Sequence, residues 1–356
     1  MGLATLLSRI LGMAREMVYA RFMGDGMVAS AFFYAFQVPN LFRRLLGEGA
    51  LTAAFIPLFK EREMQEGEKA MWEVANATLS ALITACSLVV ALLILVSTAM
   101  LHGLSLSLET MLFLKLMRWM SPYVLMVCIA AILMGTLNAR GYFFIPALGA
   151  TTMNLIMIAS VFWIAPGFGT ELIDQINGLA VGILVAGMAQ TCFQCPLLFK
   201  EGFRFRWIHP WKNETVRRLI QRILPGIVGV AAFQINILLT NAIAFSHGDH
   251  IVASFNYATR LMELPQGVFG VSLATFMLPM LSGLAAEKKY GAFQAGLRQG
   301  MQYLIFANWI ATTLTMVLAE PIVRLLFEGE RFDSSATQRA ALALQCLIPG
   351  LVSFSL

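Results

Sequence analysis

The sequence predicts an all-α, polytopic membrane protein with about ten transmembrane helices. Of its 356 residues, 58% are hydrophobic and 13% are charged, and the mean hydropathy is +0.74. A soluble domain carries about 25% charged residues, and one soluble core cannot bury so much apolar surface. The composition therefore excludes an ordinary soluble enzyme and a disordered chain, and five sparse cysteines exclude a disulfide scaffold.

The spans follow from stretches that lack charged residues. The first two expected helices, 3–23 and 27–59, carry charges inside apolar stretches, and the arginines of the first exclude a cleavable signal peptide. Each later helix contains a charge-free stretch, and all but the last of these stretches are long enough to cross a bilayer. These helices are expected at residues 74–101, 112–138, 143–165, 174–199, 219–246, 251–284, 294–319 and 336–356.

The loops alternate in basic charge. Those after the second, fourth, sixth and eighth helices are basic, and those after the first, fifth and seventh contain no Lys or Arg. The positive-inside rule therefore places the N-terminus and the basic loops in the cytoplasm. The loop after the ninth helix disagrees, because it holds Arg324, Arg331 and Arg339 on the expected outer side, together with four acidic residues.

A weak internal repeat predicts two lobes. Residues 27–30 (MVAS) match residues 251–254 (IVAS) at an offset of 224, and the following Tyr34 matches Tyr257 at an offset of 223. Six helices separate the two copies, so the repeats are parallel. We expect an N-terminal lobe of helices 1–6 over residues 1–200, a cytoplasmic basic connector over 201–218 that lies on the inner leaflet, and an incomplete C-terminal lobe over 219–356.

Arginines inside the spans are the candidate substrate-binding residues. An arginine at mid-membrane costs about 2.5–3.5 kcal/mol, so it persists where it faces water, a partner charge or an anionic ligand. Arg9, Arg15, Arg43 and Arg260 lie about a turn or more inside their spans, whereas Arg21 lies near a helix end and is expected to be structural. Guanidinium groups bind phosphate oxygens in bidentate fashion, so a cavity that they line suits a diphosphate.

Residues beside these arginines are candidates for supporting roles. Glu263, Glu48 and Glu16 lie three, four and seven positions after an arginine, on the same helix face. No acidic residue lies three or four positions from Arg15 or Arg43. The supporting candidates are Glu16, Asn40, Arg44, Glu48 and Glu263.

Prolines and glycines predict breaks in two helices. Pro39 and Pro57 fall in the second expected helix, and Pro265 and Pro279 fall in the eighth. Proline removes a backbone donor and kinks a helix. Because these two helices are repeat-related and carry candidate arginines, we expect discontinuous, moving helices at a substrate site.

Other chemistries find little support. Cys192 and Cys195 have redox spacing, but they lie in an apolar helix without further cysteine or histidine ligands. The four histidines fall in loops, and the sequence contains no Gly-rich phosphate loop and no nucleophile elbow. We therefore expect a protein that is not an enzyme, with no cofactor, no metal and no nucleic-acid partner.

Several motifs resemble those of the MurJ/MviN family of lipid II flippases, within the multidrug/oligosaccharidyl-lipid/polysaccharide exporter superfamily. They are SRILGMARE at 8–16, AFFYAFQVPNLFRR at 31–44, EGA at 48–50, AFIP at 54–57, LNAR at 137–140 and RLMELPQG at 260–267. The resemblance covers essentially the whole chain, and the PN-L-x-RR-x₃-EGA run is its most specific part.

This resemblance implies a substrate, a location and partners. The substrate is lipid II, undecaprenyl-diphosphate-linked disaccharide-pentapeptide, which alternating access between two lobes moves to the outer leaflet for peptidoglycan synthesis, cell wall biogenesis and cell shape. The location is the bacterial cytoplasmic (inner) membrane. Beside lipid II, the expected partners are membrane lipids and cell-wall synthesis proteins, and we expect a monomer. The family's cavity arginines correspond to Arg9, Arg15, Arg43 and Arg260.

The chain also departs from the family pattern. Glu16 replaces the usual Asp, Ser30 replaces a usual acidic residue and Thr259 stands where Asp is common, so cation coupling through these positions is in doubt. The family normally has fourteen helices, whose last pair forms a groove for the lipid tail. Because the chain ends at Leu356 within an apolar span, we expect a truncated product that lacks part of the second lobe and this groove.

Other functions remain open at this stage. A flippase or exporter of another polyprenyl-linked glycan or amphiphile shares the fold, and only the motif match favours lipid II. A drug exporter for organic cations would need acidic cavity residues. A membrane enzyme acting on polyprenyl diphosphate would need acidic or histidine clusters, and a scaffold would not need intramembrane arginines.

Overall fold

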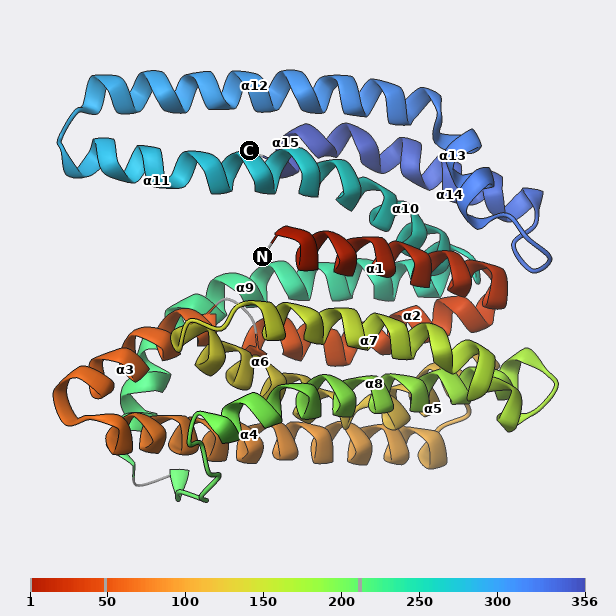
Figure 1. The fold of residues 1–356 in the computed structure, drawn as a ribbon. Coiled ribbons are helices and arrows are strands. Elements are labelled where there is room, and N and C mark those ends of the chain that lie inside the picture. Colours follow the sequence, from red (N-terminus) through yellow and green to blue (C-terminus); the bar gives the residue numbers. More distant parts are fainter. Residues whose placement is uncertain (1, 48–49, 211–212, 356) are drawn as a thin grey trace. The chain divides into compact units, whose positions relative to one another are not determined.

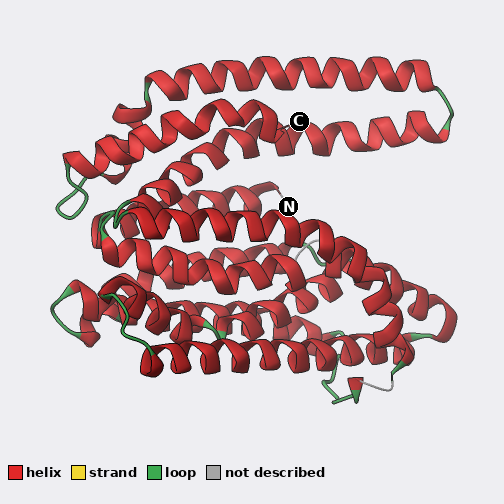
Figure 2. Cartoon of the chain, turned by 180° about the vertical axis from the view of Figure 1, so that it is seen from behind, coloured by secondary structure: helices red, strands yellow, loops and turns green. Residues whose placement is uncertain are grey.

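The computed structural model describes residues 2–47, 50–210 and 213–355, and this part of the chain is almost entirely helical, with no strand (Figures 1 and 2). The predicted all-α class is confirmed. Contacts divide the chain into two compact units. Unit 1 comprises residues 1–19 and 27–249, and unit 2 comprises residues 20–26 and 250–356. The first helix, α1 (Gly2–Met23), therefore contributes to both units.

Unit 1 is a bundle of long helices. They are α2 (Met27–Phe42), α3 (Ala50–Glu66), α4 (Glu68–Gly103), α5 (Leu108–Met120), α6 (Tyr123–Ala139), α7 (Phe144–Trp163), α8 (Leu172–Lys200) and α9 (Glu214–His247). Helix α8 packs against both α6 and α7. Glycine permits these approaches, because a Cβ atom at Gly182 would lie 2.3 Å from the Cβ atom of Ser160. Small residues of this kind are how apolar helices pack closely in a membrane.

Unit 2 holds shorter helices and one long hairpin. They are α10 (Ile251–Pro265), α11 (Ser272–Ala286), α12 (Tyr290–Val317), α13 (Ala319–Phe327), α14 (Ser334–Leu347) and α15 (Leu351–Ser355). Helices α11 and α12 lie side by side and are joined by a short turn (Figure 1). The ring of Tyr257 packs against Phe327 and Phe332, with centroids 5.1 and 5.4 Å apart, and forms an aromatic core between α10 and the end of α13.

Two helices are broken where the sequence predicts. A π-helical segment, η1 (Arg43–Gly47), follows α2, and a second one, η4 (Gln266–Val271), follows α10. Their first residues are 223 positions apart, within the offset of the internal repeat. Both begin after a proline near the end of the preceding helix, Pro39 and Pro265, which cannot donate a backbone hydrogen bond. The expected breaks are thus present after Pro39 and Pro265, whereas Pro57 and Pro279 lie inside α3 and α11. Movement of these helices at a substrate site stays a prediction.

Other breaks were not predicted. The expected helix 112–138 consists of α5 and α6, which bend by 41° at Ser121–Pro122. Pro122 lacks a backbone donor and precedes the first residue of α6. The expected loop after the ninth helix contains α13, which bends by 71° from α12 and buries Val323 and Phe327. The sequence did not indicate α13 because charged residues interrupt its short apolar pattern. The last expected helix, 336–356, is α14 followed by a 3₁₀ turn at Pro349 and by α15.

Four described helices are long and apolar enough to cross a membrane alone, and six spans result if each bent pair counts as one. The four are α4, α7, α8 and α9. The other expected spans contain charges or π-helical breaks, which lower their hydropathy or shorten each straight piece.

The compact units divide at a different place from the predicted lobes. Helix α9 packs against α2, α3 and α4, and the amide of Asn241 donates to Gln37, so α9 belongs to unit 1. The sequence repeat, in contrast, assigns residues 219–246 to the C-terminal lobe. The division into lobes at residues 200 and 219 stays a prediction about the repeat.

Candidate substrate site

Arg15 is buried in a polar cluster between α1 and α7. Its side chain lies in unit 1 and the residue is 8% exposed. Its Nη1 donates to Oδ1 of Asn154 at 2.9 Å and lies 3.7 Å from the Met157 sulfur, and its Nη2 pairs with Glu16. The guanidinium also lies 5.9 Å from the ring centroid of Tyr19. Spacing alone indicated no acidic partner for Arg15, and this was wrong, because the neighbouring Glu16 folds back onto it. Among the described residues, its buried Nε has no hydrogen-bond partner.

Asn154 fixes this arginine, and sequence reasoning missed it. Its Oδ1 accepts from Arg15, and its Nδ2 donates to the Ser8 carbonyl oxygen at 3.3 Å. One amide therefore joins α7 to two positions of α1. The sequence offered one indication, an asparagine inside a charge-free span. A polar side chain in such a place is buried, and buried polar groups form hydrogen bonds with a partner.

Arg43 and Arg9 differ in their surroundings. Arg43 opens η1, is half-buried, and donates from Nε to Oδ1 of Asn40 at 2.7 Å. Asn40 therefore orients the Arg43 side chain, and its supporting role in substrate binding stays a prediction. Arg9 is exposed on α1. Arg44 is half-buried and engaged in a contact, whereas its expected partner Glu48 lies outside the described residues.

Arg260 lies in unit 2, on α10. Its Nη1 donates to Glu263 at 2.8 Å, as the three-residue spacing predicted, and the two side chains are 30% and 41% exposed. Because Arg9, Arg15 and Arg43 belong to unit 1, the convergence of the four arginines on one substrate stays a prediction.

Two of the positions that depart from the family pattern, Ser30 and Thr259, donate hydrogen bonds to backbone carbonyl oxygens. Ser30 is fully buried and its hydroxyl donates to the Asp249 carbonyl oxygen at 2.6 Å, within unit 1. The Thr259 hydroxyl donates to the Phe255 carbonyl oxygen, one turn earlier on α10. Both hydroxyl groups satisfy backbone carbonyl groups at positions where a carboxylate is usual.

Three basic loops of unit 1 meet in one charge cluster. Arg140, after α6, contacts Glu63 of α3 at 2.7 Å and Glu201, after α8, at 2.9 Å. A hydrogen bond from Tyr142, then one from Arg140, holds the pKa of Glu201 below its ordinary value. Burial would lower the pKa of Arg140, but Glu201 and Glu63 raise it above its ordinary value. The loops that the charge pattern assigns to the same side of the membrane therefore lie together.

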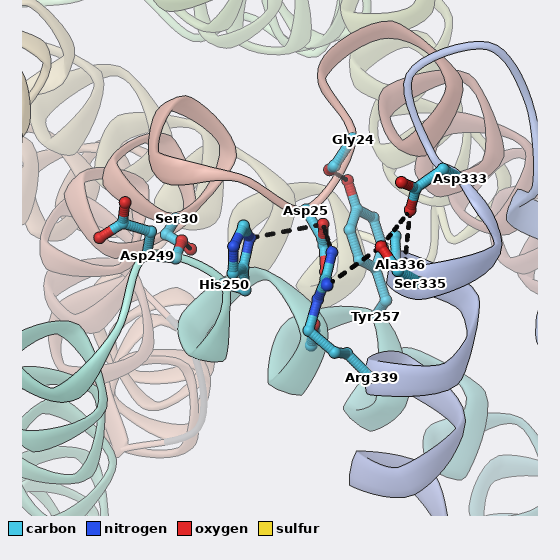
Figure 3. A network of polar contacts seen from close by, with 11 residues as sticks. Gly24, Asp25, Ser30, Asp249, His250, Tyr257, Asp333, Ser335, Ala336 and Arg339 are labelled. Atoms are coloured by element: carbon cyan, nitrogen blue, oxygen red, sulfur yellow. Dashed lines mark hydrogen bonds and ion pairs between the residues drawn. The ribbon is translucent and has the colours of Figure 1, made fainter.

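A second polar network occupies unit 2 (Figure 3). Asp25 is buried and accepts from Nε and Nη2 of Arg339, each at 2.8 Å, and from the Ser254 hydroxyl at 3.1 Å. His250 lies 3.6 Å from the same carboxylate. The Tyr257 hydroxyl donates to the carbonyl oxygen of Gly24, whose φ of 66° and closeness to Arg331 leave no room for a Cβ atom. Arg339 is one of the arginines that disagreed with the charge pattern.

Comparison with known proteins decides the family. A sequence model described as "Lipid II flippase MurJ" matches residues 19–356. The chain is 30% identical to the "Probable lipid II flippase MurJ" of Vibrio cholerae, over 99% of this chain and 69% of that protein. It is 32% identical to the protein of the same description from Rhizobium tropici, over 100% of this chain and 67% of that protein.

The chain belongs to the MurJ lipid II flippase family.

Solved structures agree with this membership of the MurJ family. The chain is similar to "Lipid II flippase MurJ, inward closed conformation", with a TM-score of 0.82 and 25% identity over 99% of this chain and 73% of that one. It also shares its fold with an inward-facing multidrug resistance transporter of the MATE family, with a TM-score of 0.79 and 15% identity over 98% of this chain and 78% of that one. The predicted resemblance to MurJ is confirmed, and so is the expectation of a membrane transporter rather than an enzyme.

Proposed function

We propose that the chain moves lipid II from the inner to the outer leaflet of the bacterial cytoplasmic membrane, with its diphosphate bound by Arg9, Arg15, Arg43 and Arg260. Membership of the MurJ family supports the substrate, because the relatives that match are described as lipid II flippases. The observation that carries the proposal is the buried Arg15, a charged side chain of α1 that Asn154 and Glu16 hold in place. An arginine inside a span is costly and marks a functional site by default.

The chemistry of guanidinium suits a diphosphate. Its planar fork donates two parallel hydrogen bonds to phosphate oxygens, and such charge-assisted bonds are about twice as strong as neutral ones. Asn154 and Asn40 hold Arg15 and Arg43 in fixed orientations. Positioned donors lose less conformational entropy when the ligand binds. In this proposal the asparagines are positioning residues and the arginines contact the substrate.

Alternating access supplies the transport step in this proposal. The π-helical segments η1 and η4 lie at repeat-related positions, and Arg43 is the first residue of one of them. Such irregular backbone inside a span is tolerated where it is enclosed by protein or lines a cavity. We place the moving segments of the transport cycle at these two breaks, so that substrate charge and helix geometry are coupled.

Location and partners belong to the same proposal. The charge pattern and the clustering of the basic loops around Arg140 support an N-terminus in the cytoplasm. Membrane lipids surround the spans, cell-wall synthesis proteins use the product, and the chain works as a monomer. The proposal includes no cofactor.

Binding selectivity tests the substrate. The chain in lipid nanodiscs is titrated with lipid II, with undecaprenyl monophosphate and with a lipophilic organic cation. The proposal predicts that lipid II binds more tightly than either of the others, because only lipid II offers a diphosphate and the glycopeptide. Tighter binding of the cation would contradict it and favour a drug exporter of the same fold.

The second candidate, transport of another polyprenyl-linked glycan, is tested by competition. An undecaprenyl diphosphate that carries a different glycan should displace lipid II only at a higher concentration. Equal displacement would show that the chain does not select lipid II.

The direction of transport is measured in cells that are depleted of their own flippase. An impermeant enzyme that cleaves lipid II is added outside, and the cleaved fraction reports how much lipid II has reached the outer leaflet. An unchanged fraction on expression of the protein would contradict outward movement.

A further inference from the structure

The segment that follows α8 is fixed to α4 and is not a free loop. Residues 203–208 have no helical structure, yet their backbone is held by two side chains one turn apart on α4. Asn76 donates to the Arg204 carbonyl oxygen at 3.1 Å and accepts from the Arg206 N–H at 2.9 Å. Ser80 accepts from the Ile208 N–H at 3.1 Å. The buried Phe203 packs on Trp72, with ring centroids 5.5 Å apart.

This fixed segment presents two arginines and two aromatic rings. Arg204, Phe205, Arg206 and Trp207 are all exposed, and the indole is 55% exposed. The rings of Phe205 and Trp207 meet edge to face at 6.5 Å. Arg204 is oriented by hydrogen bonds to the Phe199 and Phe203 carbonyl oxygens. In the part of the chain that the structure describes, no acidic side chain pairs with Arg204 or Arg206.

The level of the segment matches a membrane interface. The charges of α4 end at Glu73, and residues 76–101 contain no charge. Asn76 and Ser80 therefore lie at the start of the apolar part of α4. Tryptophan is enriched at this level, and arginine beside it reaches the headgroups. Residues 200–222 carry seven basic and two acidic residues, a net charge of +5, which equals that of the whole chain.

We propose that residues 203–208 form a preformed docking platform for anionic phospholipid headgroups at the membrane interface. Phe205 and Trp207 enter the interfacial layer, and Arg204 and Arg206 bind the phosphates. Since α4 fixes the backbone, the platform is ordered before lipid binds, which lowers the entropy cost of binding. This inference goes beyond the proposed function and does not depend on it, because its ligand is bulk phospholipid and not lipid II.

Quenching of Trp207 by brominated lipid tests the platform. The chain is placed in nanodiscs that contain either brominated phosphatidylglycerol or brominated phosphatidylcholine at equal mole fraction. The fluorescence of Trp207 is obtained by subtracting the fluorescence of the Trp207→Phe variant from that of the unmodified chain. This subtraction cancels the contribution of the other five tryptophans. We expect stronger quenching by the anionic lipid, because each basic residue near an anionic surface strengthens the binding of that lipid about fivefold.

Two variants separate a defined platform from diffuse charge. Arg204→Gln with Arg206→Gln should make quenching by the two lipids equal. Arg217→Gln with Arg218→Gln removes the same charge from exposed positions of α9 and should keep the preference for phosphatidylglycerol. Asn76→Ala keeps both arginines but removes two of the hydrogen bonds, and should weaken the preference. Circular dichroism checks that each variant is folded.

Three results would overturn the inference. Equal quenching by both lipids in the unmodified chain would show that the segment does not select anionic headgroups. An equal loss in both double variants would show that net charge, and not the platform, attracts the lipid. No quenching by either lipid would place Trp207 in water, where its surroundings suit an acidic protein partner instead.

Discussion

Arg339 forms a bidentate ion pair with Asp25, which lies 314 residues earlier in the chain. This pair attaches the turn after α1 to α14 within unit 2 (Figure 3). Arg339 is also one of the three arginines that disagree with the charge pattern. Arg324 pairs with Glu320 and Glu328, and Arg331 donates to the Phe22 carbonyl oxygen. The basic residues of this expected outer loop are thus all engaged within the protein.

Removing the Asp25 charge should loosen this part of unit 2. Asp25→Asn leaves Arg339 without its carboxylate and should cost about 2 kcal/mol, because hydrogen bonds to charged groups contribute about 1.5–3 kcal/mol. Hydrogen–deuterium exchange of the α14 amides should accelerate by more than tenfold. Arg324→Gln is the control, because it removes two exposed pairs that are each worth less than about 1 kcal/mol. Equal exchange in both variants would contradict this role of Asp25.

Asn154 should affect substrate affinity through Arg15. Asn154→Ala removes the hydrogen bond from Arg15, worth about 1 kcal/mol, together with the one to the Ser8 carbonyl oxygen, and should weaken lipid II binding at least about fivefold. Asn177→Ala is a matched control, since this buried amide donates only to the Ile173 and Asp174 carbonyl oxygens of its own helix among the described residues. Titration of each variant in nanodiscs gives the affinities. The role assigned to Asn154 fails if both variants bind lipid II alike.

The Arg140 cluster should make stability depend on pH. The pKa of Glu201 is lowered by the hydrogen bonds of Tyr142 and Arg140, and that of Glu63 by Lys60 and then by Arg140. A lowered pKa in the folded state adds stability above the ordinary glutamate value of 4.5, and this stability is lost as the pH falls through the folded pKa. The midpoint of thermal unfolding should therefore fall more steeply with acid in the unmodified chain than in Arg140→Gln. Parallel pH profiles would contradict the prediction.

Two histidines test the orientation. His209 follows the fixed segment, His247 ends α9, and both are exposed. In a variant whose five cysteines are replaced, an impermeant thiol reagent added to intact cells should label His247→Cys and spare His209→Cys. Permeabilised cells serve as the control, because both positions should then react. The reverse pattern in intact cells would place the N-terminus outside.

The sequence predicts the parts of this protein that depend on local chemistry. Hydropathy locates the spans, and Pro39 and Pro265 mark the two breaks, because proline acts on its own helix. The pairing of Arg260 with Glu263 follows from helical spacing. Asn154 and Asp25 were missed because their partners lie 139 and 314 residues away. No periodicity within one helix indicates which distant polar residue will meet a buried arginine.

The affinity of lipid II for single arginine variants tests the central claim most directly. Arg15→Ala and Arg260→Ala are compared with Arg21→Ala, which removes an exposed arginine near the end of the same helix as Arg15. The account predicts that each of the first two weakens binding by more than about tenfold, since each removes charge-assisted bonds to the diphosphate. It also predicts that Arg21→Ala binds as the unmodified chain does. Unchanged affinity in Arg15→Ala and Arg260→Ala would contradict the assignment of these arginines to the substrate.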